Sequence, residues 1–311
     1  MSDAPKLRLG TRASPLARWQ ADWVRDQLIA AGIDVEMILI TTEGDQQTSQ
    51  PLGQIGGQGL FTKEIQRRLL AGDIDLAVHS LKDLPTLPID GLSLAAVPER
   101  EDTADILIGP AGTSLATLPS GAKIGTGSLR RKAQLLHARA DLEILDIRGN
   151  VDTRLRKLDE GQYHAIILAA AGLKRLKLDD RMTERLEAPL MLPAVGQGAL
   201  GIESRSDDPT TRKLLAPLSH APTLQAVIAE RSLLAALRAG CLAPVGAHAQ
   251  VVDGQLTLAA VVLSIDGQSR LFASLTSAPA DAAQLGEEVA ELLRQQGATE
   301  LLASSRGNRL D

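Results

Sequence analysis

Residues 122–170 read AKIGTGSLRRKAQLLHARADLEILDIRGNVDTRLRKLDEGQYHAIILAA, and their pattern sets the fold class. Three short apolar runs alternate with two longer segments whose apolar residues recur at helical spacing. Strands that alternate with helices in this way are typical of α/β units with largely parallel sheets. We expect strands over 122–126, 142–147 and 165–170, and helices over 128–139 and 151–160.

The chain before this stretch has the same alternation. A further apolar run, GALGIESR at 198–205, comes after it, and we expect the chain to cross back there and complete the first unit. The alternation predicts strands over 6–10, 35–41, 74–80, 92–97 and 105–109, with helices over about 15–30 and 60–71.

The last seventy or so residues change character, since AHAQVVD, QLTLAAVVLS and SRLFASLT alternate like antiparallel strands. Asp-Gly pairs at 253–254 and 266–267 are hairpin turn signals. We therefore expect two α/β domains and a small C-terminal α+β domain, with a helix-rich stretch from about 208 to 238 and later helices near 281–296 and 299–304. The expected boundaries are 1–99 with 199–217, then 104–193, then 221–311.

Composition excludes several classes of protein. No run of about 18 apolar residues exists, and the N-terminus MSDAPKLRLG lacks the apolar core of a signal peptide, so we expect a cytoplasmic protein. The single cysteine excludes an internal disulfide and a Cys-pair zinc site. The five histidines are scattered without ligand spacing, so we expect no metal.

Charge is distributed unevenly along the chain. The net charge is −5, yet residues 123–177 hold twelve Lys and Arg against six Asp and Glu. A basic segment in an acidic chain with five aromatic residues favours a focused anion site over a nucleic-acid surface, which would favour a basic domain and, for single strands, stacking aromatics. A solvated basic helix face is the alternative.

Three strand-to-helix junctions are built alike. Ser14 precedes Pro15, Ser128 precedes Leu129, and Asn150 or Asp152 begins the third helix, so each junction offers a capping residue. A helix N-terminus attracts anions, and a neighbouring arginine adds a planar fork that matches a carboxylate. Capping alone would explain any one junction, but three with arginines predict an anion site at the carboxyl ends of the strands. The arginines are Arg12, Arg130, Arg131, Arg148 and Arg154.

Three further segments carry candidate chemistry. Lys82 and Asp83 follow the strand at 74–80 and lie at the same edge, although a surface turn pair is the commoner fate of such a dipeptide. Residues 42–59 hold five glycines in a stretch too long for a simple connector, so we expect a mobile lid, with disorder as the alternative. Cys241 lies in AGCLAPVG, on an expected loop, although a buried core cysteine would fit the residue alone.

Long motifs in these segments resemble the porphobilinogen deaminase family. They occur in order across residues 11–246, whereas the region past 250 matches only in general layout. The motifs are TRASPLARWQ (11–20), GLFTKE (59–64), DLAVHSLKDLP (75–85), ERED (99–102), GTGSLRR (125–131), RGNVDTRLRKL (148–158), ILAAAGLKRL (167–176), LPAVGQGALGIE (192–203) and GCLAPVG (240–246).

The resemblance implies a fold and a set of site residues. The first two domains would fold like periplasmic binding proteins, with the active site in the cleft between them. Asp83 would be the catalytic carboxylate, and Cys241 would carry a dipyrromethane cofactor through a thioether. The cofactor would contact Lys82, Asp83, Thr126, Ser128, Arg130 and Arg131, and the substrate Arg12, Ser14, Gln20, Arg148, Gly149 and Arg154.

The resemblance also implies a reaction. A monomeric enzyme would deaminate four porphobilinogen molecules in turn, join them head to tail on the cofactor and release hydroxymethylbilane. Each pyrrole brings two carboxylates, which accounts for the basic segment. Neither nucleic acid nor a membrane would be a partner.

Gln58 stands where many relatives carry lysine, Pro98 where some carry a second cysteine, and Ala239 where glycine is common. The main rival function is a non-catalytic anion receptor, which would need neither Cys241 nor Asp83. A regulatory or nucleic-acid-binding protein is the second rival, and it lacks the charge and aromatics.

Overall fold

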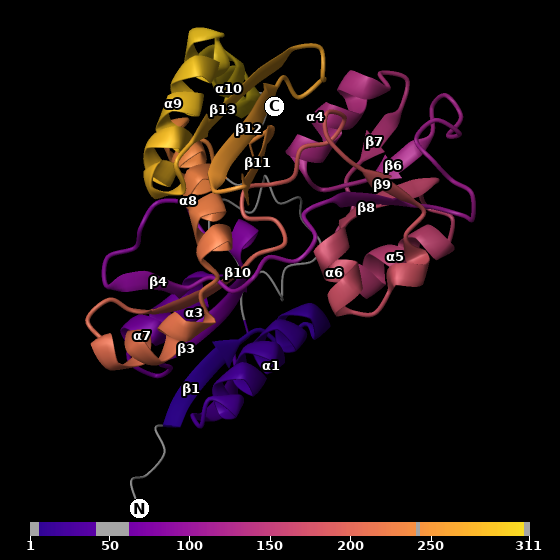
Figure 1. The fold of residues 1–311 in the computed structure, drawn as a ribbon. Helices are drawn as coiled ribbons and strands as arrows, with labels where there is room; N and C mark the ends of the chain where they lie inside the picture. Colours follow the sequence, from indigo (N-terminus) through magenta and orange to yellow (C-terminus); the bar gives the residue numbers. More distant parts are fainter. Residues whose placement is uncertain (1–5, 42–61, 241–242, 308–311) are drawn as a thin grey trace, which may run out of the picture.

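The structure is a computed structural model that describes residues 6–41, 62–240 and 243–307. Its described part forms two α/β units, each around a mixed sheet, and a smaller C-terminal unit of three strands and helices (Figure 1). The expected fold class is thereby confirmed. Within the described residues no helix combines the length and apolar character needed to cross a membrane.

The first sheet has the order β2-β1-β3-β10-β4. Strands β1, β2, β3 and β4 run parallel, and β10 runs antiparallel between β3 and β4. Helix α1 covers one face, where Val24 and Leu28 pack on Leu9, and α3 covers the other with Ile65 and Leu69. The elements are β1 (Lys6–Thr11), α1 (Pro15–Ala30), β2 (Asp34–Leu39), α3 (Lys63–Leu70), β3 (Leu76–Ser80), β4 (Leu92–Ala96), β10 (Leu200–Arg205) and α7 (Pro209–Leu215).

The second sheet repeats this plan in the order β7-β6-β8-β5-β9, with β5 as its antiparallel strand. Leu135 of α4 packs on one face, and Leu155 of α5 and Leu173 of α6 pack on the other. The elements are β5 (Asp105–Ile108), β6 (Lys123–Gly125), α4 (Leu129–Ala138), β7 (Glu143–Leu145), α5 (Val151–Asp159), β8 (Ala165–Ala169), α6 (Ala170–Arg175) and β9 (Glu184–Leu186).

Two crossover segments join these units. The chain leaves the first sheet after β4 and enters the second at β5, then leaves after β9 and returns at β10. In each sheet the antiparallel strand is therefore the one that arrives by a crossover. The two segments are tied to each other, because Glu101 N donates to Gly198 O at 3.2 Å. The strand expected over 198–205 is β10, and it lies in the first sheet.

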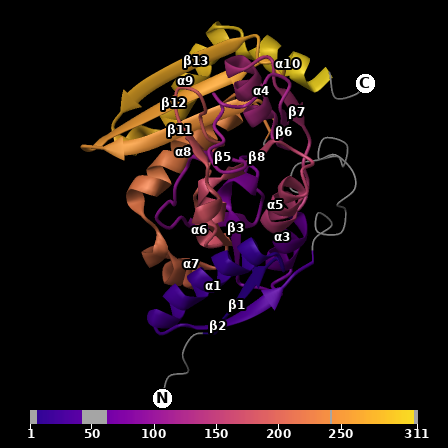
Figure 2. The same cartoon turned by 90° about the vertical axis from the view of Figure 1, so that its right-hand side faces the viewer.

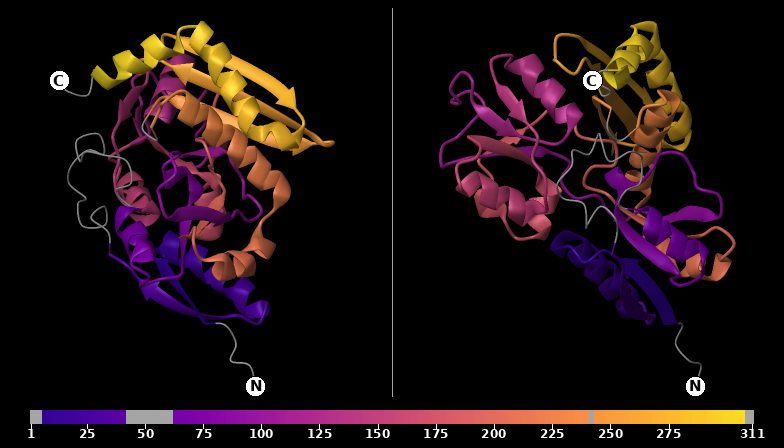
Figure 3. Two further views of the ribbon diagram at one scale, coloured as in Figure 1. Left: turned by 90° about the vertical axis from the view of Figure 1, so that its left-hand side faces the viewer. Right: turned by 180° about the vertical axis from the view of Figure 1, so that it is seen from behind.

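The C-terminal unit stacks a sheet on helices. Strands β11 (Val245–Val252), β12 (Gln255–Leu263) and β13 (Arg270–Ser277) form an antiparallel sheet, and both α8 (Ala221–Ala236) and α9 (Ala282–Gln295) pack on it. A last helix, α10 (Ala298–Gly307), follows. This unit lies at the far end of the molecule from β1 and β2 (Figure 2). In the view from behind, α8 runs between the β11–β13 sheet and the first α/β unit (Figure 3).

The sequence predicted most elements within a few residues but missed α6 and β9. Helix α6 follows β8 without a break, and β9 has only three residues, so neither gives a separate periodic signal. The turn at 253–254 has φ values of 50° and 74°, as a two-residue hairpin with Asp-Gly requires. The three domain boundaries remain a prediction, which limited proteolysis would test.

Candidate active site

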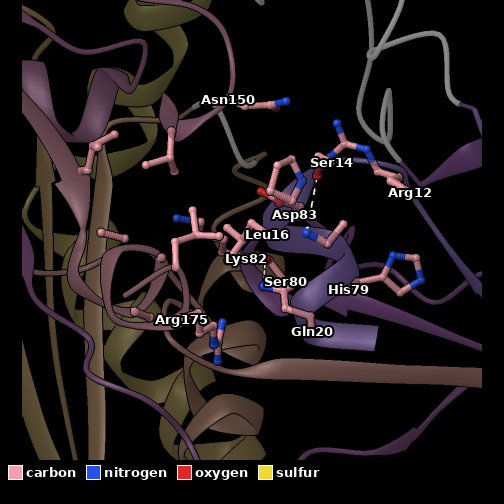
Figure 4. Close-up of a pocket in the computed structure, with 18 of the residues that line it drawn as sticks. Arg12, Ser14, Leu16, Gln20, His79, Ser80, Lys82, Asp83, Asn150 and Arg175 are labelled. Atoms are coloured by element: carbon pink, nitrogen blue, oxygen red, sulfur yellow. Dashed lines mark hydrogen bonds between the residues drawn. The ribbon is translucent and has the colours of Figure 1, made fainter. Parts of the chain in front are cut away.

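A cleft of about 210 Å³ lies between the two α/β units and is lined by residues from both. The first unit contributes the residues after β1 and β3, and the second contributes those after β7 and β8 (Figure 4). It contains eight of the residues expected at the site: Arg12, Ser14, Gln20, Lys82, Asp83, Arg131, Gly149 and Arg154. The ends of strands from two sheets therefore face one cavity, as the junctions predict.

Positive charge dominates the described lining of this cleft. Five cationic side chains, Arg12, Lys82, Arg131, Arg154 and Arg175, accompany the two carboxylates of Asp83 and Asp152. Burial lowers the pKa of Arg154 and of Arg175 to about 10 each, which still leaves both charged at neutral pH. A cavity with this balance is suited to a ligand that carries several carboxylates.

Two of the three expected helix caps are made by side chains. Ser14 Oγ accepts a hydrogen bond from Ala17 N at 3.4 Å, and Ser128 Oγ accepts one from Arg131 N at 3.5 Å. Asn150 occupies the third N-cap position, but its side chain makes no capping bond. It lines the cleft instead, with Gly149 beside it at a φ of +110°. The third junction thus leaves its capping side chain available for another contact in the cleft.

Lys82 and Asp83 occupy a single 3₁₀ turn, Leu81–Asp83, that follows β3 directly. Asp83 is exposed to the cleft, and Lys82 is partly buried behind it. Burial lowers the pKa of Lys82 to about 8, the charge of Arg131 acts in the same direction, and the Asp83 carboxylate opposes them. Gln20 supports this edge from α1, since its Nε2 donates to Ser80 Oγ at 2.8 Å.

The two arginines at the start of α4 share one buried carboxylate. Arg130 Nη1 lies 2.5 Å from Asp105 Oδ2, and Arg131 donates from Nε and Nη2 to Asp105 Oδ1 at 2.9 and 2.7 Å. Burial alone would raise the pKa of Asp105, but the two guanidinium charges hold it far below its ordinary range. Arg131 also donates to Ile167 O at 2.9 Å. Much of the hydrogen-bonding capacity of both arginines is therefore used within the protein.

Arg148 has buried donors without an acceptor. Its Nε and Nη2 make no hydrogen bond to any described residue, and a carboxylate oxygen of Asp146, Oδ2, lies 3.5 Å from Nε. Arg154 uses its Nε on Gly149 O at 2.7 Å. Unpaired buried donors are costly, so Nε and Nη2 of Arg148 favour a further acceptor beyond the described residues.

A second, smaller cavity of about 40 Å³ lies behind the Lys82 turn. Lys82, Ser128 and Arg130 line it together with Gly240 and Ala243, the described residues before and after Cys241 and Leu242. Cys241 itself, like the expected lid at 42–59, lies outside the described residues.

Thr126 and Arg148 line neither cavity. Thr126 is buried, and its Oγ1 accepts from Ser128 N at 3.2 Å. Lys82, Ser128 and Arg130, whose Nε has no acceptor among the described residues, line the small cavity and give it donors for a carboxylate.

Two residues of the site were missed from the sequence. Arg175 of α6 lines the cleft, donates to Gly198 O at 2.7 Å and lies over the Trp19 ring at 5.7 Å. Arg175 lies in the family motif ILAAAGLKRL, which could have pointed to it, but the motif by itself assigns no role to this arginine. Asp105 opens the buried strand β5, and a lone carboxylate before three apolar residues was its only signal. Within the described residues no group of three His, Cys, Asp or Glu side chains could hold a metal ion.

Two α/β units of like topology, with a cationic cleft between their strand ends, define the class of two-unit proteins whose cleft is suited to a small anionic ligand. Family models of porphobilinogen deaminase match most of the chain: the dipyromethane cofactor binding domain over residues 7–213 and the C-terminal domain over 224–295. The chain belongs to the porphobilinogen deaminase family. It is a transferase of tetrapyrrole biosynthesis.

Two curated relatives agree with this assignment. Porphobilinogen deaminase of Syntrophotalea carbinolica is 50% identical over 300 residues, which is 96% of this chain and 95% of the relative. That of Geobacter sulfurreducens is 50% identical over 96% of this chain and 94% of its own. Among solved structures, the methionine binding protein MetQ gives a TM-score of 0.45 at 13% identity, over 71% of this chain and 90% of its own.

Proposed function

We propose that the chain condenses four porphobilinogen molecules head to tail on a dipyrromethane primer bound through Cys241, and releases hydroxymethylbilane. The observation that carries this proposal is the position of the Lys82–Asp83 turn. It separates the cationic cleft from the small cavity lined by Gly240 and Ala243. One turn thus places Asp83 in the cleft and Lys82 in the lining of both cavities.

The cofactor carboxylates would be held by Lys82, Ser128, Arg130 and Arg131, with Thr126 supporting Ser128. When bound, dipyrromethane supplies the terminal pyrrole carbon to which new units are added. Arg131 is held by Asp105, so its guanidinium is oriented before any ligand arrives. An oriented donor loses less entropy on binding than a mobile one, which favours tight retention of the primer.

The incoming porphobilinogen would be bound by residues of both units. Arg12, Ser14 and Gln20 line the cleft from the first unit and Gly149 and Arg154 from the second, and Arg148 would join them when the substrate binds. Each charge-assisted hydrogen bond to an acetate or propionate contributes about 1.5–3 kcal/mol. Because the residues come from two units, binding also holds the reacting pyrrole in place relative to the chain that it joins.

Asp83 would be the catalytic carboxylate. It is exposed to the cleft and is flanked by Lys82. As the C–N bond of the protonated aminomethyl group breaks, neutral ammonia leaves, and its positive charge remains on the substrate pyrrole as a cation. The Asp83 carboxylate stabilises that cation, and after the new C–C bond forms it accepts the proton lost from the attacking carbon.

The proposal extends to where the enzyme acts and in what oligomeric state. We expect the enzyme to act on porphobilinogen in the cytoplasm, as a monomer, without a nucleic-acid or membrane partner. Light scattering of the purified protein at working concentration would test the monomer, since a dimer would double the mass.

Intact mass of the purified protein tests the proposed function most directly. The mass is expected to exceed that of the chain by one dipyrromethane, and Cys241→Ser is expected to remove both the excess and the turnover of porphobilinogen. The serine hydroxyl in that variant nearly keeps the size of the thiol but forms no thioether. Normal turnover by a protein of unmodified mass would falsify the proposal.

A further inference from the structure

Arg231, on α8, holds the chain directly after the Lys82–Asp83 turn. Its Nη2 donates to Pro85 O at 2.6 Å, and its Nη1 lies 3.5 Å from Leu84 O. The side chain thus reaches from the C-terminal unit to the end of the turn that bears the proposed catalytic carboxylate. A guanidinium on successive carbonyls is a strong, directional contact, because the donor is charged.

Arg231 lines two cavities that lie on either side of the chain after this turn. It lines the small cavity together with Lys82, Ser128 and Gly240. It also lines an outer cavity of about 270 Å³, whose other walls include residues 84–89. Arg231 therefore lies between the small cavity beside Lys82 and the outer cavity beside residues 84–89.

Other contacts hold the start, the closure and the apolar side of the turn. Leu81 N donates to Ala199 O at 3.0 Å, and Leu84 N closes the turn on Leu81 O at 3.1 Å. The buried side chains of Leu81 and Leu84 pack with Val227 of α8. These contacts fix the start and the closure of the turn, and Arg231 adds a hold on the chain that leaves it, at Leu84 O and Pro85 O.

The neighbouring residue, Glu230, fixes the helix from which Arg231 projects. Glu230 is fully buried and accepts hydrogen bonds from Arg100 Nη1 at 2.7 Å and from Gly196 N at 2.7 Å. Both partners belong to the crossover segments, and Ala249 N of β11 donates to the same carboxylate at 2.9 Å. These hydrogen bonds fix α8 at Glu230, and the chain continues from α8 to Gly240. The helix therefore holds both the Lys82–Asp83 turn, through Arg231, and the segment that precedes Cys241.

We propose that Arg231 is a positioning residue, which aligns the Asp83 carboxylate with the primer by holding the end of its turn on the helix that leads to the cofactor cysteine. This inference rests on the proposed function of Asp83. Arg231 itself touches no reacting atom, so its effect on the reaction passes through Asp83. A misplacement of about 1 Å can cost about a hundredfold in rate.

The experiment compares Arg231→Ala and Arg231→Lys with a matched control, Arg294→Ala. Arg294 Nη1 also donates to a backbone carbonyl, Ala236 O of the same helix at 2.9 Å, but it lies on α9, away from the turn. For Arg231→Ala we expect the cofactor mass to be retained, kcat to fall by roughly ten- to a hundredfold, and KM to stay within about threefold. Arg231→Lys is expected to recover part of the loss, because an ammonium can reach one of the two carbonyls. Arg294→Ala is expected to turn over like the parent.

A double-mutant cycle with Asp83→Asn separates positioning from a general loss of structure. If Arg231 acts through Asp83, adding Arg231→Ala to Asp83→Asn should cost less than about twofold more in single-turnover rate. The same penalty in both backgrounds would overturn the inference while leaving the proposed function intact, and so would normal kcat in Arg231→Ala. Near-normal turnover by Asp83→Asn alone would overturn the proposed role of Asp83, and the inference with it. Should Arg231→Ala fail to fold, Arg231→Lys in the same cycle decides the question.

Discussion

Arg131 donates two hydrogen bonds, from Nε at 2.9 Å and from Nη2 at 2.7 Å, to one carboxylate oxygen of Asp105, and both side chains are buried. Arg130 contacts the other oxygen of the same carboxylate. Gln197, from the returning crossover, adds a hydrogen bond to Asp105 Oδ1 at 2.9 Å. The start of α4 is thereby fixed to β5 and to the crossover between the units, so the two arginines are in position before a ligand binds.

Asp105→Asn is expected to destabilise the protein, because it leaves two buried guanidinium groups without a counter-charge. Removing one partner of a buried ion pair typically costs about 3–5 kcal/mol. Urea unfolding followed by circular dichroism measures the free energy of unfolding. Asp141→Asn is the control, since Asp141 pairs with Arg139 at the surface of the same unit, and it should leave the unfolding midpoint nearly unchanged. Equal midpoints for Asp105→Asn and the parent would contradict the structural role.

Asp83→Asn keeps the shape of the side chain and removes its charge and its capacity to accept a proton. General acid–base help typically contributes about 10²–10⁴ in rate, and electrostatic stabilisation adds to it, so we expect turnover to fall about a thousandfold or more. Asp83→Glu keeps the charge in a different position and should retain measurable activity with some partly elongated enzyme. Turnover of porphobilinogen and intact mass measure both. Activity of Asp83→Asn within about tenfold of the parent would make Asp83 an ordinary turn residue.

Lys82 is expected to make ligand binding depend on pH near 8. Burial lowers its pKa to about 8, so its charge is present below that pH and lost above it. Binding of a cofactor carboxylate favours the charged form, so the rate at which the apoenzyme takes up its cofactor should fall as pH rises through about 8. Lys82→Arg keeps a positive charge through this range and should flatten that limb of the profile. An unchanged limb in Lys82→Arg would assign the titration to another group.

The same pKa shift has a consequence for stability with the opposite sign. The folded-state pKa of Lys82 lies below its ordinary value of 10.5. The unfolded chain therefore binds more protons between about pH 8 and pH 10.5, and the Lys82 contribution to the free energy of unfolding rises with pH across that window. Below about pH 8 the buried charge lowers stability. Denaturant titrations of the parent and of Lys82→Met at several pH values would measure this contribution.

Arg12, Arg148 and Arg154 are expected to serve the substrate, whereas Arg130 and Arg131 hold the cofactor. Loss of one charge-assisted contact of about 1.5–3 kcal/mol should lower kcat/KM by roughly ten- to a hundredfold in Arg12→Leu, Arg148→Leu and Arg154→Leu, with cofactor mass retained. Arg156→Leu is the control, because Arg156 lies on α5 near Arg154 in sequence but pairs with Glu160 in solvent.

Steady-state kinetics and intact mass together check this division. Arg130→Leu and Arg131→Leu are expected to yield protein without the cofactor mass. Normal kcat/KM in all three substrate variants would show that the cleft has been assigned wrongly.

The fold class could be predicted because it depends on local pattern. Alternation of apolar runs with amphipathic segments marked nearly every strand and helix, and the Asp-Gly pair at 253–254 marked a hairpin turn. Ser14 and Ser128 were recognisable as caps, since capping is decided within one turn of the helix. The long motifs identified the family for the same reason, because each is a contiguous stretch of chain.

The sequence by itself determined which elements form and which residues end each strand, since these follow from side-chain periodicity and capping chemistry along a few neighbouring residues. Only the tertiary structure decided that Asp105 holds both arginines of α4, that Arg175 enters the cleft, and that Arg231 reaches the turn bearing Asp83. The pairs Asp105–Arg131 and Arg231–Pro85 join residues 26 and 146 positions apart. Electrostatic and hydrogen-bonding contacts act over a few ångströms in space, so no local pattern records them until the two crossovers have brought the units together.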